Sequence, residues 1–379
     1  MSAIRVLQVF TIMNRGGAES MIMNYYRNMD RTKIQFDFLV HRKQSAAFDQ
    51  EITDLGGKIY RFDPINPLFP GSYYKNLRLF FKEHSEYKII HSHLNTFSYF
   101  PLKVAKEFGV PCRIAHAHIA LEKIKFSNIF SGGEGLKETL KSIIKIWLKR
   151  RIHKPTTHNF TCGDKAGIWL FGSDTNHTTM NNAVDAEKFI FNEETRASYR
   201  KEFNFENQLV IGHVGSFTKQ KNHSYLLKIF SELLQSYPQS KLILIGGGPL
   251  KESIKSEAVE LGIQGDVKFL GVREDIPQLI QMLDFFVFPS FYEGLPVTLI
   301  EAQSAGLKII ASDTITEEVL LTDDIKFLSI KENPSFWVKP ILDLKNYERK
   351  NNLDIIKDKK YDIKQNVKEI EKFYLQQLN

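Results

Sequence analysis

The stretch DFFVFPSFYEGLPVTLIEAQSAGLKIIAS (284–312) decides the fold. It begins with a short apolar run at 284–290, continues through a loop with glycine and proline, and enters a helical pattern at 296–305. A second apolar run, KIIAS (308–312), follows Gly306. A strand, a helix and a second strand of these lengths predict a βαβ unit, which belongs to a parallel sheet covered by helices.

The rest of the chain repeats this alternation. In the second half, strands are expected at 209–215, 241–247 and 266–271, and helices at 225–236, 250–261 and 276–282. In the first half, strands are expected at 4–10, 36–40, 58–60, 88–93 and 113–118, and helices at 18–28, 48–55, 73–84 and 99–108. A polar stretch at 182–194 separates the halves. The pattern predicts an α/β protein with two Rossmann-like domains in tandem.

Length and composition agree with two domains. A chain of 379 residues exceeds what one hydrophobic core usually supports. Its two cysteines, Cys112 and Cys162, give no disulfide framework and fit a reducing compartment. The N-terminus lacks the apolar core and cleavage site of a signal peptide, and no stretch has the roughly 20 apolar residues that span a bilayer. We therefore expect a cytoplasmic protein.

Most of the net charge of +7 comes from one segment. Residues 121–155 hold nine lysines or arginines and three glutamates, a net of +6. Within 135–152, apolar residues recur at helical spacing beside the basic ones: Leu136, Leu140, Ile143, Ile144, Trp147 and Leu148. The pattern is typical of an ordinary domain helix with a solvated basic side, and also of a helix that docks on anionic lipid.

Ligands of parallel sheets bind at the carboxyl ends of strands, where loops lead into helix N-termini. Two such corners are rich in glycine: Gly16 and Gly17 follow the first strand, and Gly246 to Gly248 precede Pro249. Neither is a GxGxxG fingerprint, which argues against an NAD-dependent oxidoreductase. Each corner is either a tight turn or a loop that lets a ligand approach the backbone.

The corner within the opening stretch is the most informative one. Pro296 at a helix start leaves the following amides of Val297 and Thr298 available for phosphate oxygens. Glu293 precedes this helix and Glu301 lies about two turns later, with seven residues between the two glutamates. Carboxylates in these places can accept hydrogen bonds from sugar or ribose hydroxyls.

These motifs resemble those of glycosyltransferase family 4, whose members have the GT-B fold. Glu293 and Glu301 look like the family's EX7E motif. Other segments resemble the family in the correct order: RGGAES (15–20), NNAVD (181–185), GHVGSFTKQKNH (212–223), IGGGPL (245–250), VKFLGVREDIP (267–277) and FPSFYEGLPVTLIEAQSAGLKII (288–310). Exopolysaccharide and capsular polysaccharide enzymes of the family are similar at MNRGGAE (13–19), KIQFDFL (33–39) and SDTITE (312–317).

The resemblance implies a fold and a division of labour. Two Rossmann-like domains are expected to face each other across a cleft, with an acceptor-binding domain at 1–184 and a nucleotide-sugar-binding domain at 185–360. A C-terminal helix at 361–379 is expected to pack back on the first domain.

The resemblance also implies roles for the matching residues. Glu301 resembles the glutamate that binds the donor ribose, Glu293 the one near the transferred sugar, and Lys221 the lysine that neutralises the diphosphate. His118 resembles the histidine beside the anomeric carbon; His116 is the alternative, and we expect only one of the two to face a given side of the sheet. The implied catalytic residues are His118, Lys221 and Glu293. The implied donor-binding residues are Gly16, Gly17, Ser216, Lys221, Gly248, Val272, Glu293, Gly294, Leu295, Pro296, Val297, Thr298 and Glu301, and the acceptor-side residues are His93 and His116.

Ser216 departs from the family pattern. The family usually has an arginine here that shares the diphosphate with the lysine, and serine supplies neither the charge nor the fork of donors, although Lys219 is close in sequence. The chain has no DxD triplet and no cysteine or histidine cluster with metal spacing. We therefore expect neither a metal nor another cofactor.

The sequence thus predicts a retaining, metal-independent glycosyltransferase. The expected donor is a UDP-sugar, and the expected acceptor is an undecaprenyl-diphosphate-linked oligosaccharide of exopolysaccharide or capsule biosynthesis. The anionic inner face of the plasma membrane is a further expected partner, and no nucleic acid is expected. Two alternatives stay open: a weak or inactive homologue that serves as a binding subunit of a polysaccharide assembly complex, which Ser216 favours, and a GT-B sugar-nucleotide epimerase, which the order of the motifs disfavours.

Overall fold

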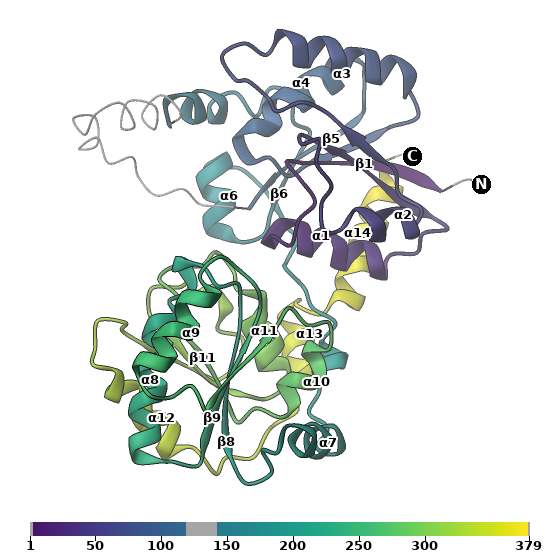
Figure 1. The fold of residues 1–379 in the computed structure, drawn as a ribbon. Coiled ribbons are helices and arrows are strands. Elements are labelled where there is room, and N and C mark those ends of the chain that lie inside the picture. The colour runs from purple at the N-terminus through teal and green to yellow at the C-terminus, as the bar shows by residue number, and fades with distance from the viewer. Residues whose placement is uncertain (1–2, 119–141, 378–379) are drawn as a thin grey trace, which may run out of the picture. The chain divides into compact units, whose positions relative to one another are not determined.

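The computed structural model describes residues 3–118 and 142–377, which form two compact units (Figure 1). Unit 1 comprises Met1–Ala183 and Ile363–Asn379, and unit 2 comprises Val184–Asp362. The sequence-based expectation places the first domain boundary after residue 184 and the second after residue 360. The last helix, α14 (Ile363–Gln376), belongs to unit 1 although it follows unit 2 in the chain.

Unit 1 is built on a parallel seven-stranded sheet with the order β3-β2-β1-β4-β5-β6-β7. The strands are β1 (Ile4–Phe10), β2 (Ile34–Val40), β3 (Ile59–Arg61), β4 (Ile89–Ser92), β5 (Cys112–Ala117), β6 (His158–Thr161) and β7 (Thr178–Thr179). Its helices include α1 (Gly17–Asn28), α2 (Asp49–Asp54), α3 (Gly71–Glu83), α4 (Tyr99–Glu107), α6 (Asp164–Phe171) and α14. The strand order reverses between β1 and β4, and ligands of such sheets bind at the carboxyl ends of the strands at this switch point.

Helices cover both faces of this sheet (Figure 1). On one face, α1 and α14 pack against alternate residues of β1 that include Val6 and Phe10. On the other face, α3 and α4 pack against Leu7 and Val9. Burial of both faces explains why β1 is an almost continuous apolar run in the sequence.

Unit 2 repeats this architecture with a parallel six-stranded sheet in the order β10-β9-β8-β11-β12-β13. The strands are β8 (Leu209–Val214), β9 (Ser240–Ile245), β10 (Val267–Gly271), β11 (Phe285–Phe288), β12 (Lys308–Ser312) and β13 (Ile325–Leu328). The helices are α7 (Glu193–Phe203), α8 (His223–Ser236), α9 (Lys251–Glu260), α10 (Ile276–Gln281), α11 (Val297–Ser304), α12 (Pro334–Asp343) and α13 (Leu353–Asp358). In chain order the strands follow the Rossmann arrangement 3-2-1-4-5-6, with the switch point between β8 and β11. The predicted βαβ unit is present as β11, α11 and β12.

The sequence-based reading missed four helices and three strands: α6, α7, α12, α13, β6, β7 and β13. Helix α7 has Arg200 as its only buried residue, so it has no apolar stripe of helical period that would predict it. Besides the partly buried Tyr199 and Phe203, two guanidinium groups hold it in place. Arg196 and Arg200 lie 2.6 Å and 2.5 Å from the carboxylate oxygens of Asp284. None of the helices in the described ranges is long and apolar enough to cross a membrane.

Candidate active site

An ion pair joins the loops that follow β8 and β11 at the switch point of unit 2. Lys221 Nζ lies 2.7 Å from Glu293 Oε1, and the two side chains are only 15% and 9% exposed. The ammonium group also lies over the ring of Phe288, 4.6 Å from its centre. The fold therefore brings together two residues that the sequence predicts to act on the donor.

Hydrogen bonds between the same two loops hold Lys221 in position. Gln220 Nε2 donates to Tyr292 O at 2.9 Å. Asn222 adopts a left-handed conformation with φ 55°, and its Nδ2 donates to Pro289 O at 3.1 Å. Lys221 lies between these two anchored residues, so its ammonium group is placed before any ligand binds.

Close packing explains two of the glycines at 246–248. Gly246 and Gly248 have φ of 146° and 149°, and a Cβ on them would lie 2.0 Å from Gly215 O and 2.7 Å from Phe217 N. Phe217 N also donates to Gly247 O at 2.8 Å. The corner is therefore a tight turn that packs backbone against backbone on the loop after β8. The donor contact predicted for Gly248 stays a prediction.

The N-terminus of α11 supplies hydrogen-bond donors after Glu293. Pro296 is the N-cap, and Val297 begins the helix. The amides of Val297 and Thr298 belong to the first turn, where an α-helix has no internal partner for them. A Cβ on Gly294 would meet nothing within 4 Å, so there is open space beside this loop. Thr298 Oγ1 is buried and without a hydrogen-bond partner in the part of the chain that the structure describes.

Glu301 follows on the second turn of α11. Burial raises the pKa of its carboxyl group to about 8. The group is therefore mostly protonated at neutral pH, and in this form it can both donate and accept a hydrogen bond.

Three other predicted positions lie on exposed loops of unit 2. Ser216 and Lys219 are exposed in the segment after β8, where Lys219 begins the 3-10 helix Lys219–Lys221. Val272, which follows β10, is 59% exposed. The Ser216 side chain carries no charge that could replace the arginine of the family. Lys219 is the cation nearest to Lys221 in sequence.

At the switch point of unit 1, Gly16 caps α1 and Gly17 begins it. A Cβ on Gly17 would meet nothing within 4 Å, whereas one on Gly16 would lie 2.3 Å from Glu19 Oε2. The Glu19 carboxyl group therefore lies against the first turn of its own helix, and burial raises its pKa. No role was predicted for Glu19, although it lies beside Gly16 and Gly17, which the resemblance implies are donor-binding residues.

Four histidines form one array at the carboxyl ends of β4 and β5. The rings of His91 and His93 stack with centres 4.3 Å apart, and those of His116 and His118 with centres 4.1 Å apart. His91 Nε2 lies 3.0 Å from His116 Nδ1, and His93 Nδ1 lies 2.8 Å from His118 Nε2. The expectation that only one of His116 and His118 would face a given side of the sheet is wrong, because residues two apart on a strand share a face.

The array also brings together three histidines in the manner of a metal site, which the sequence-based reading did not expect. Ring nitrogens of His91, His93 and His116 lie within 4.8 Å of one another. Stacked rings, however, direct their lone pairs along parallel planes rather than toward one point. The nitrogens that face each other are also within hydrogen-bonding distance, so the array is better described as a hydrogen-bonded network.

Burial keeps these histidines neutral. It lowers the pKa of His118 to about 3 and the pKa values of His91, His93 and His116 well below their usual range. A neutral imidazole has one donor nitrogen and one acceptor nitrogen. His118 can therefore exchange a hydrogen bond with a sugar hydroxyl without bringing a positive charge.

Comparison with known proteins identifies the family. The family model for glycosyl transferases group 1 matches residues 195–361. The putative glycosyltransferase EpsF of Bacillus subtilis (strain 168) is 37% identical over 347 residues, which cover 89% of this chain and 86% of that protein. This chain belongs to the group 1 glycosyltransferases. It is a glycosyltransferase with the GT-B fold, as the sequence motifs predicted.

Two further similarities concern the fold and a more distant relative. The solved structure of Anabaena Alr3699/HepE in complex with UDP and glucose matches this glycosyltransferase with a TM-score of 0.74 and 18% identity, covering 98% of this chain and 100% of that one. The Escherichia coli UDP-Gal:alpha-D-GlcNAc-diphosphoundecaprenol alpha-1,3-galactosyltransferase is 28% identical over 260 residues, covering 65% of this chain and 63% of that protein.

Two residues near the histidines of this glycosyltransferase were missed by the sequence-based reading. Gln8 is fully buried in the middle of β1, and its Oε1 lies 2.9 Å from His93 Nε2. Tyr374 on α14 places its hydroxyl 2.7 Å from His91 Nδ1. A polar residue inside the apolar run IRVLQVF was a signal for Gln8. No comparable signal marks Tyr374, because its contact depends on where α14 packs.

The basic segment divides in the structure. Its part before residue 142, with Leu136 and Leu140 of the predicted stripe, lies outside the described residues. Residues 142–149 are helical, and Leu148 is buried in unit 1. Ile143 and Trp147 are 55% and 45% exposed. The apolar stripe therefore packs partly on unit 1 and partly faces outward among the basic residues.

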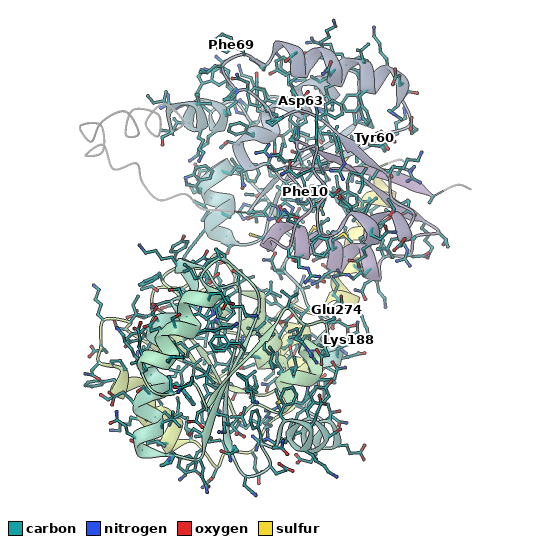
Figure 2. The ribbon with its side chains drawn as sticks, viewed as in Figure 1. Phe10, Tyr60, Asp63, Phe69, Lys188 and Glu274 are labelled. Atoms are coloured by element: carbon teal, nitrogen blue, oxygen red, sulfur yellow. The ribbon has the colours of Figure 1, made fainter. Side chains whose placement is uncertain are left out.

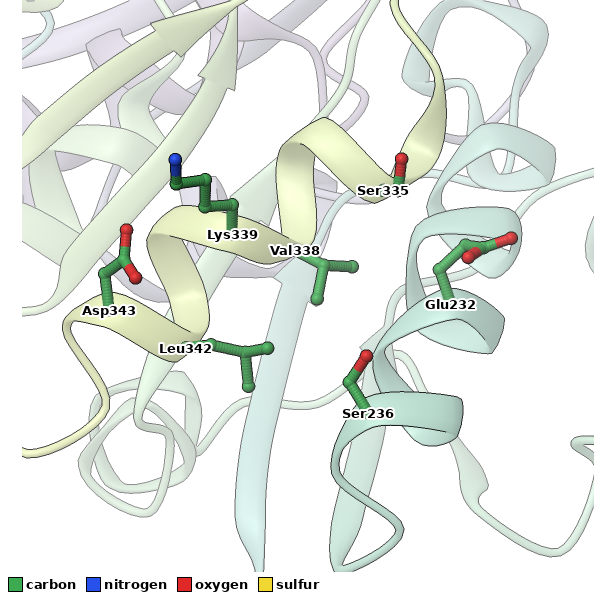
Figure 3. A pocket seen from close by; sticks show the side chains of 7 residues that line it. All are labelled: Glu232, Ser236, Ser335, Val338, Lys339, Leu342 and Asp343. Atoms are coloured by element: carbon green, nitrogen blue, oxygen red, sulfur yellow. The ribbon is translucent and has the colours of Figure 1, made fainter.

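A groove between α8 and α12 lies elsewhere in unit 2 (Figure 3). It is lined by Glu232, Ser236, Ser335, Val338, Lys339, Leu342 and Asp343. None of these residues is on the loops that hold Lys221 and Glu293, and Glu232 and Ser236 lie in the C-terminal half of α8. The groove is therefore separate from the predicted donor site.

Proposed function

We propose that this glycosyltransferase is a retaining, metal-independent enzyme. It transfers a sugar from a UDP-sugar to a lipid-linked acceptor, an undecaprenyl-diphosphate-linked oligosaccharide, in exopolysaccharide or capsule biosynthesis. Unit 2 binds the donor, and unit 1 binds the acceptor. The arrangement of Lys221 and Glu293 at the switch point of unit 2 is the observation that carries this proposal.

The proposed chemistry is charge stabilisation on the leaving group. The bond between the anomeric carbon and the diphosphate oxygen breaks, and the acceptor hydroxyl attacks the same face while its proton passes to the departing phosphate. Lys221 and the first amides of α11 stabilise the negative charge that develops on the diphosphate. Glu293 holds the lysine in place before the reaction and accepts hydrogen bonds from the transferred sugar.

A solved structure, a named relative and short sequence segments support the proposed classes of donor and acceptor. HepE, solved with UDP and glucose, has the same fold. The Escherichia coli relative is named for a UDP-galactose donor and a diphosphoundecaprenol acceptor. The segments MNRGGAE, KIQFDFL and SDTITE resemble exopolysaccharide and capsular enzymes. Metal independence rests on the sequence, which has no DxD triplet for holding a metal against the diphosphate.

The test is transfer from radiolabelled UDP-sugars to a bacterial membrane lipid extract. Lys221→Ala should lower kcat about 100-fold or more, as the loss of a group that stabilises developing charge does. Lys228→Ala is the matched control, since this lysine is exposed on α8 outside both loops, and it should change kcat by less than about threefold. EDTA should leave the wild-type rate unchanged. A rate that EDTA abolishes and Mn²⁺ restores would contradict the metal-free mechanism.

Ser216 favours a second candidate, a weak or inactive homologue that acts as a binding subunit. If serine only weakens neutralisation of the diphosphate, Ser216→Arg should raise transfer or tighten UDP binding, because arginine adds a bidentate cation. A wild-type protein that binds UDP but transfers no sugar from any UDP-sugar, with Ser216→Arg equally inactive, would favour the binding subunit. Interconversion of free UDP-sugars would instead identify an epimerase.

A further inference from the structure

A chain of hydrogen bonds leads from the interior of unit 1 to His118. Gln8 Oε1 lies 2.9 Å from His93 Nε2, and His93 Nδ1 lies 2.8 Å from His118 Nε2. The three residues come from β1 and from the ends of β4 and β5, whose parallel register places them on one face of the sheet. Because β1 and β4 flank the switch point, the chain ends at the edge where a ligand is expected.

The direction of each hydrogen bond follows from the chemistry of its groups. A carboxamide oxygen only accepts, so His93 Nε2 must carry the hydrogen that it shares with Gln8. Burial keeps His93 neutral, so its other nitrogen, Nδ1, is an acceptor. His118 Nε2 must then carry a hydrogen, and the remaining nitrogen of this neutral ring, Nδ1, is left with a lone pair.

We propose that Gln8, acting through His93, is a positioning residue that fixes His118 in its Nε2–H tautomer, so that Nδ1 presents a lone pair to a substrate hydroxyl. The inference rests on the proposed function only for the identity of that substrate. A fixed tautomer matters because the opposite form presents a donor at Nδ1 and cannot accept the hydroxyl hydrogen.

The surroundings hold the two rings as well as their protons. The ring of Phe10, labelled in Figure 2, stacks on that of His93 with centres 4.2 Å apart. His93 N donates to Val9 O at 2.9 Å, and His118 N donates to Asn95 Oδ1 at 2.8 Å. These contacts fix the ring of His93 and the backbone of both histidines. The tautomer of each ring is then the property that Gln8 can still determine.

Packing alone does not explain Gln8. Its neighbours on the same face of β1, Val6 and Phe10, belong to the hydrophobic core. Gln8 Nε2 is buried and makes no hydrogen bond of regular geometry among the described residues, although the Gln8 side chain interacts with the hydroxyl of Tyr374. A buried amide without a regular hydrogen bond is unfavourable, so an apolar residue of similar size would serve the core better. The unfavourable burial of this amide is explained if Gln8 Oε1 serves to accept the hydrogen of His93 Nε2.

The test replaces Gln8 and reads the tautomers directly. In protein labelled with 15N in its histidines, long-range proton–nitrogen correlation spectra near pH 7.5 should show His118 as the Nε2–H tautomer. Gln8→Met keeps the length of the side chain and removes the acceptor, so the spectra should show mixed tautomers at His93 and His118. The kcat for transfer should fall about tenfold, while UDP affinity, a property of unit 2, should not change.

Two comparisons separate positioning from a structural role. Gln8→Met should keep or raise the midpoint of thermal unfolding, because it removes this buried amide. Tyr73→Phe is the matched control: it removes a buried tyrosine–histidine hydrogen bond elsewhere in unit 1, to His41, and should leave the His118 tautomer and kcat as in the wild type.

An Nδ1–H tautomer of His118 in the wild type would overturn the proposal, and so would an unchanged tautomer in Gln8→Met. The spectra need no substrate, so they decide the proposal independently of the reaction. If they agree with it while His118→Ala transfers sugar at the wild-type rate, the positioning by Gln8 stands and the catalytic role proposed for His118 falls.

Discussion

Glu301 and Lys221 represent two opposite ways of preparing a charge for a ligand. Lys221 is paired with Glu293 before the donor arrives, so its charge is compensated within the protein. No cation among the described residues pairs with Glu301, and burial raises its pKa to about 8. The predicted ribose site therefore starts from a neutral carboxyl group, which hydroxyl groups can convert into a carboxylate by donating hydrogen bonds to it.

The protonation state of Glu301 predicts a pH dependence of nucleotide binding. Hydrogen bonds to a carboxylate are stronger than those to a neutral acid, so bound ribose lowers the pKa of Glu301. Binding then releases a proton, and UDP affinity should rise between pH 7 and about pH 8.5, by less than tenfold per pH unit. Titration calorimetry in buffers with different ionisation enthalpies measures the affinity and the released proton.

Two variants test this prediction. Glu301→Gln resembles the neutral acid and should bind UDP about as well as the wild type at pH 7, with no increase at higher pH. Glu301→Ala should bind about 10- to 100-fold more weakly, since it loses hydrogen bonds to a group that becomes charged. Equal pH dependence in the wild type and Glu301→Gln would show that another group takes up the proton.

At the scale of elements, most strands and most helices of this glycosyltransferase could be predicted from the sequence, because both faces of each sheet are buried. Burial on both faces produces apolar runs such as IRVLQVF, and the Gly-rich and Pro-containing corners mark where they end. Helix α7 could not be predicted this way, since only Tyr199 and Phe203 pack on the core and polar contacts of Arg196 and Arg200 add to them.

The predicted site residues also divide into those that a local sequence pattern marks and those that depend on tertiary contacts. Glu293 and Glu301 carry a local spacing that the sequence displays, and the contact of Glu293 with Lys221 follows from parallel strands that end at one edge. The histidine array depends on the register between β4 and β5 and on the position of α14. No local sequence pattern predicts either of them. Sequence reasoning therefore found His93, His116 and His118 but not the hydrogen bonds among them.

The helix at 142–149 gives a prediction of its own. Exposed Ile143 and Trp147 stand among basic residues, and each basic residue near an anionic surface contributes about 1 kcal/mol of attraction that salt screens. The protein should therefore sediment with phosphatidylglycerol vesicles at low salt, dissociate at high salt and ignore phosphatidylcholine vesicles. Replacing Lys145, Lys149, Arg150 and Arg151 together with glutamine should abolish this binding.

The control for the helix at 142–149 removes the same charge from unit 2. Its four substitutions to glutamine are at Lys251, Lys255, Lys268 and Lys326. This variant should still sediment with anionic vesicles, and both quadruple variants should bind UDP. Equal loss of vesicle binding in the two variants would mean that net charge, rather than this helix, drives the association.

At the scale of the whole molecule, neutral buried histidines connect the site with stability. Burial lowers the pKa of eight of the eleven histidines: His41, His91, His93, His116, His118, His158, His213 and His223. Unfolding returns each one to a pKa near 6.5. Below that pH the unfolded chain binds more protons than the folded one, so the free energy of unfolding falls as pH falls.

The four histidines of the array make unit 1 sensitive to acid. Each histidine that stays neutral in the folded state lowers the free energy of unfolding by about 1.4 kcal/mol per pH unit below pH 6.5. All four together lower it by about 5 kcal/mol per pH unit. Because domains are usually stable by about 5 to 15 kcal/mol, unit 1 should unfold near pH 5, above the range where most carboxylates titrate. Urea unfolding of Trp337→Phe between pH 5 and 7.5, followed by the fluorescence of Trp147 and Trp169, reports on unit 1 alone. Adding His91→Phe and His116→Phe should reduce the pH slope by about half, and a slope that these substitutions leave unchanged would show that the array is not its source.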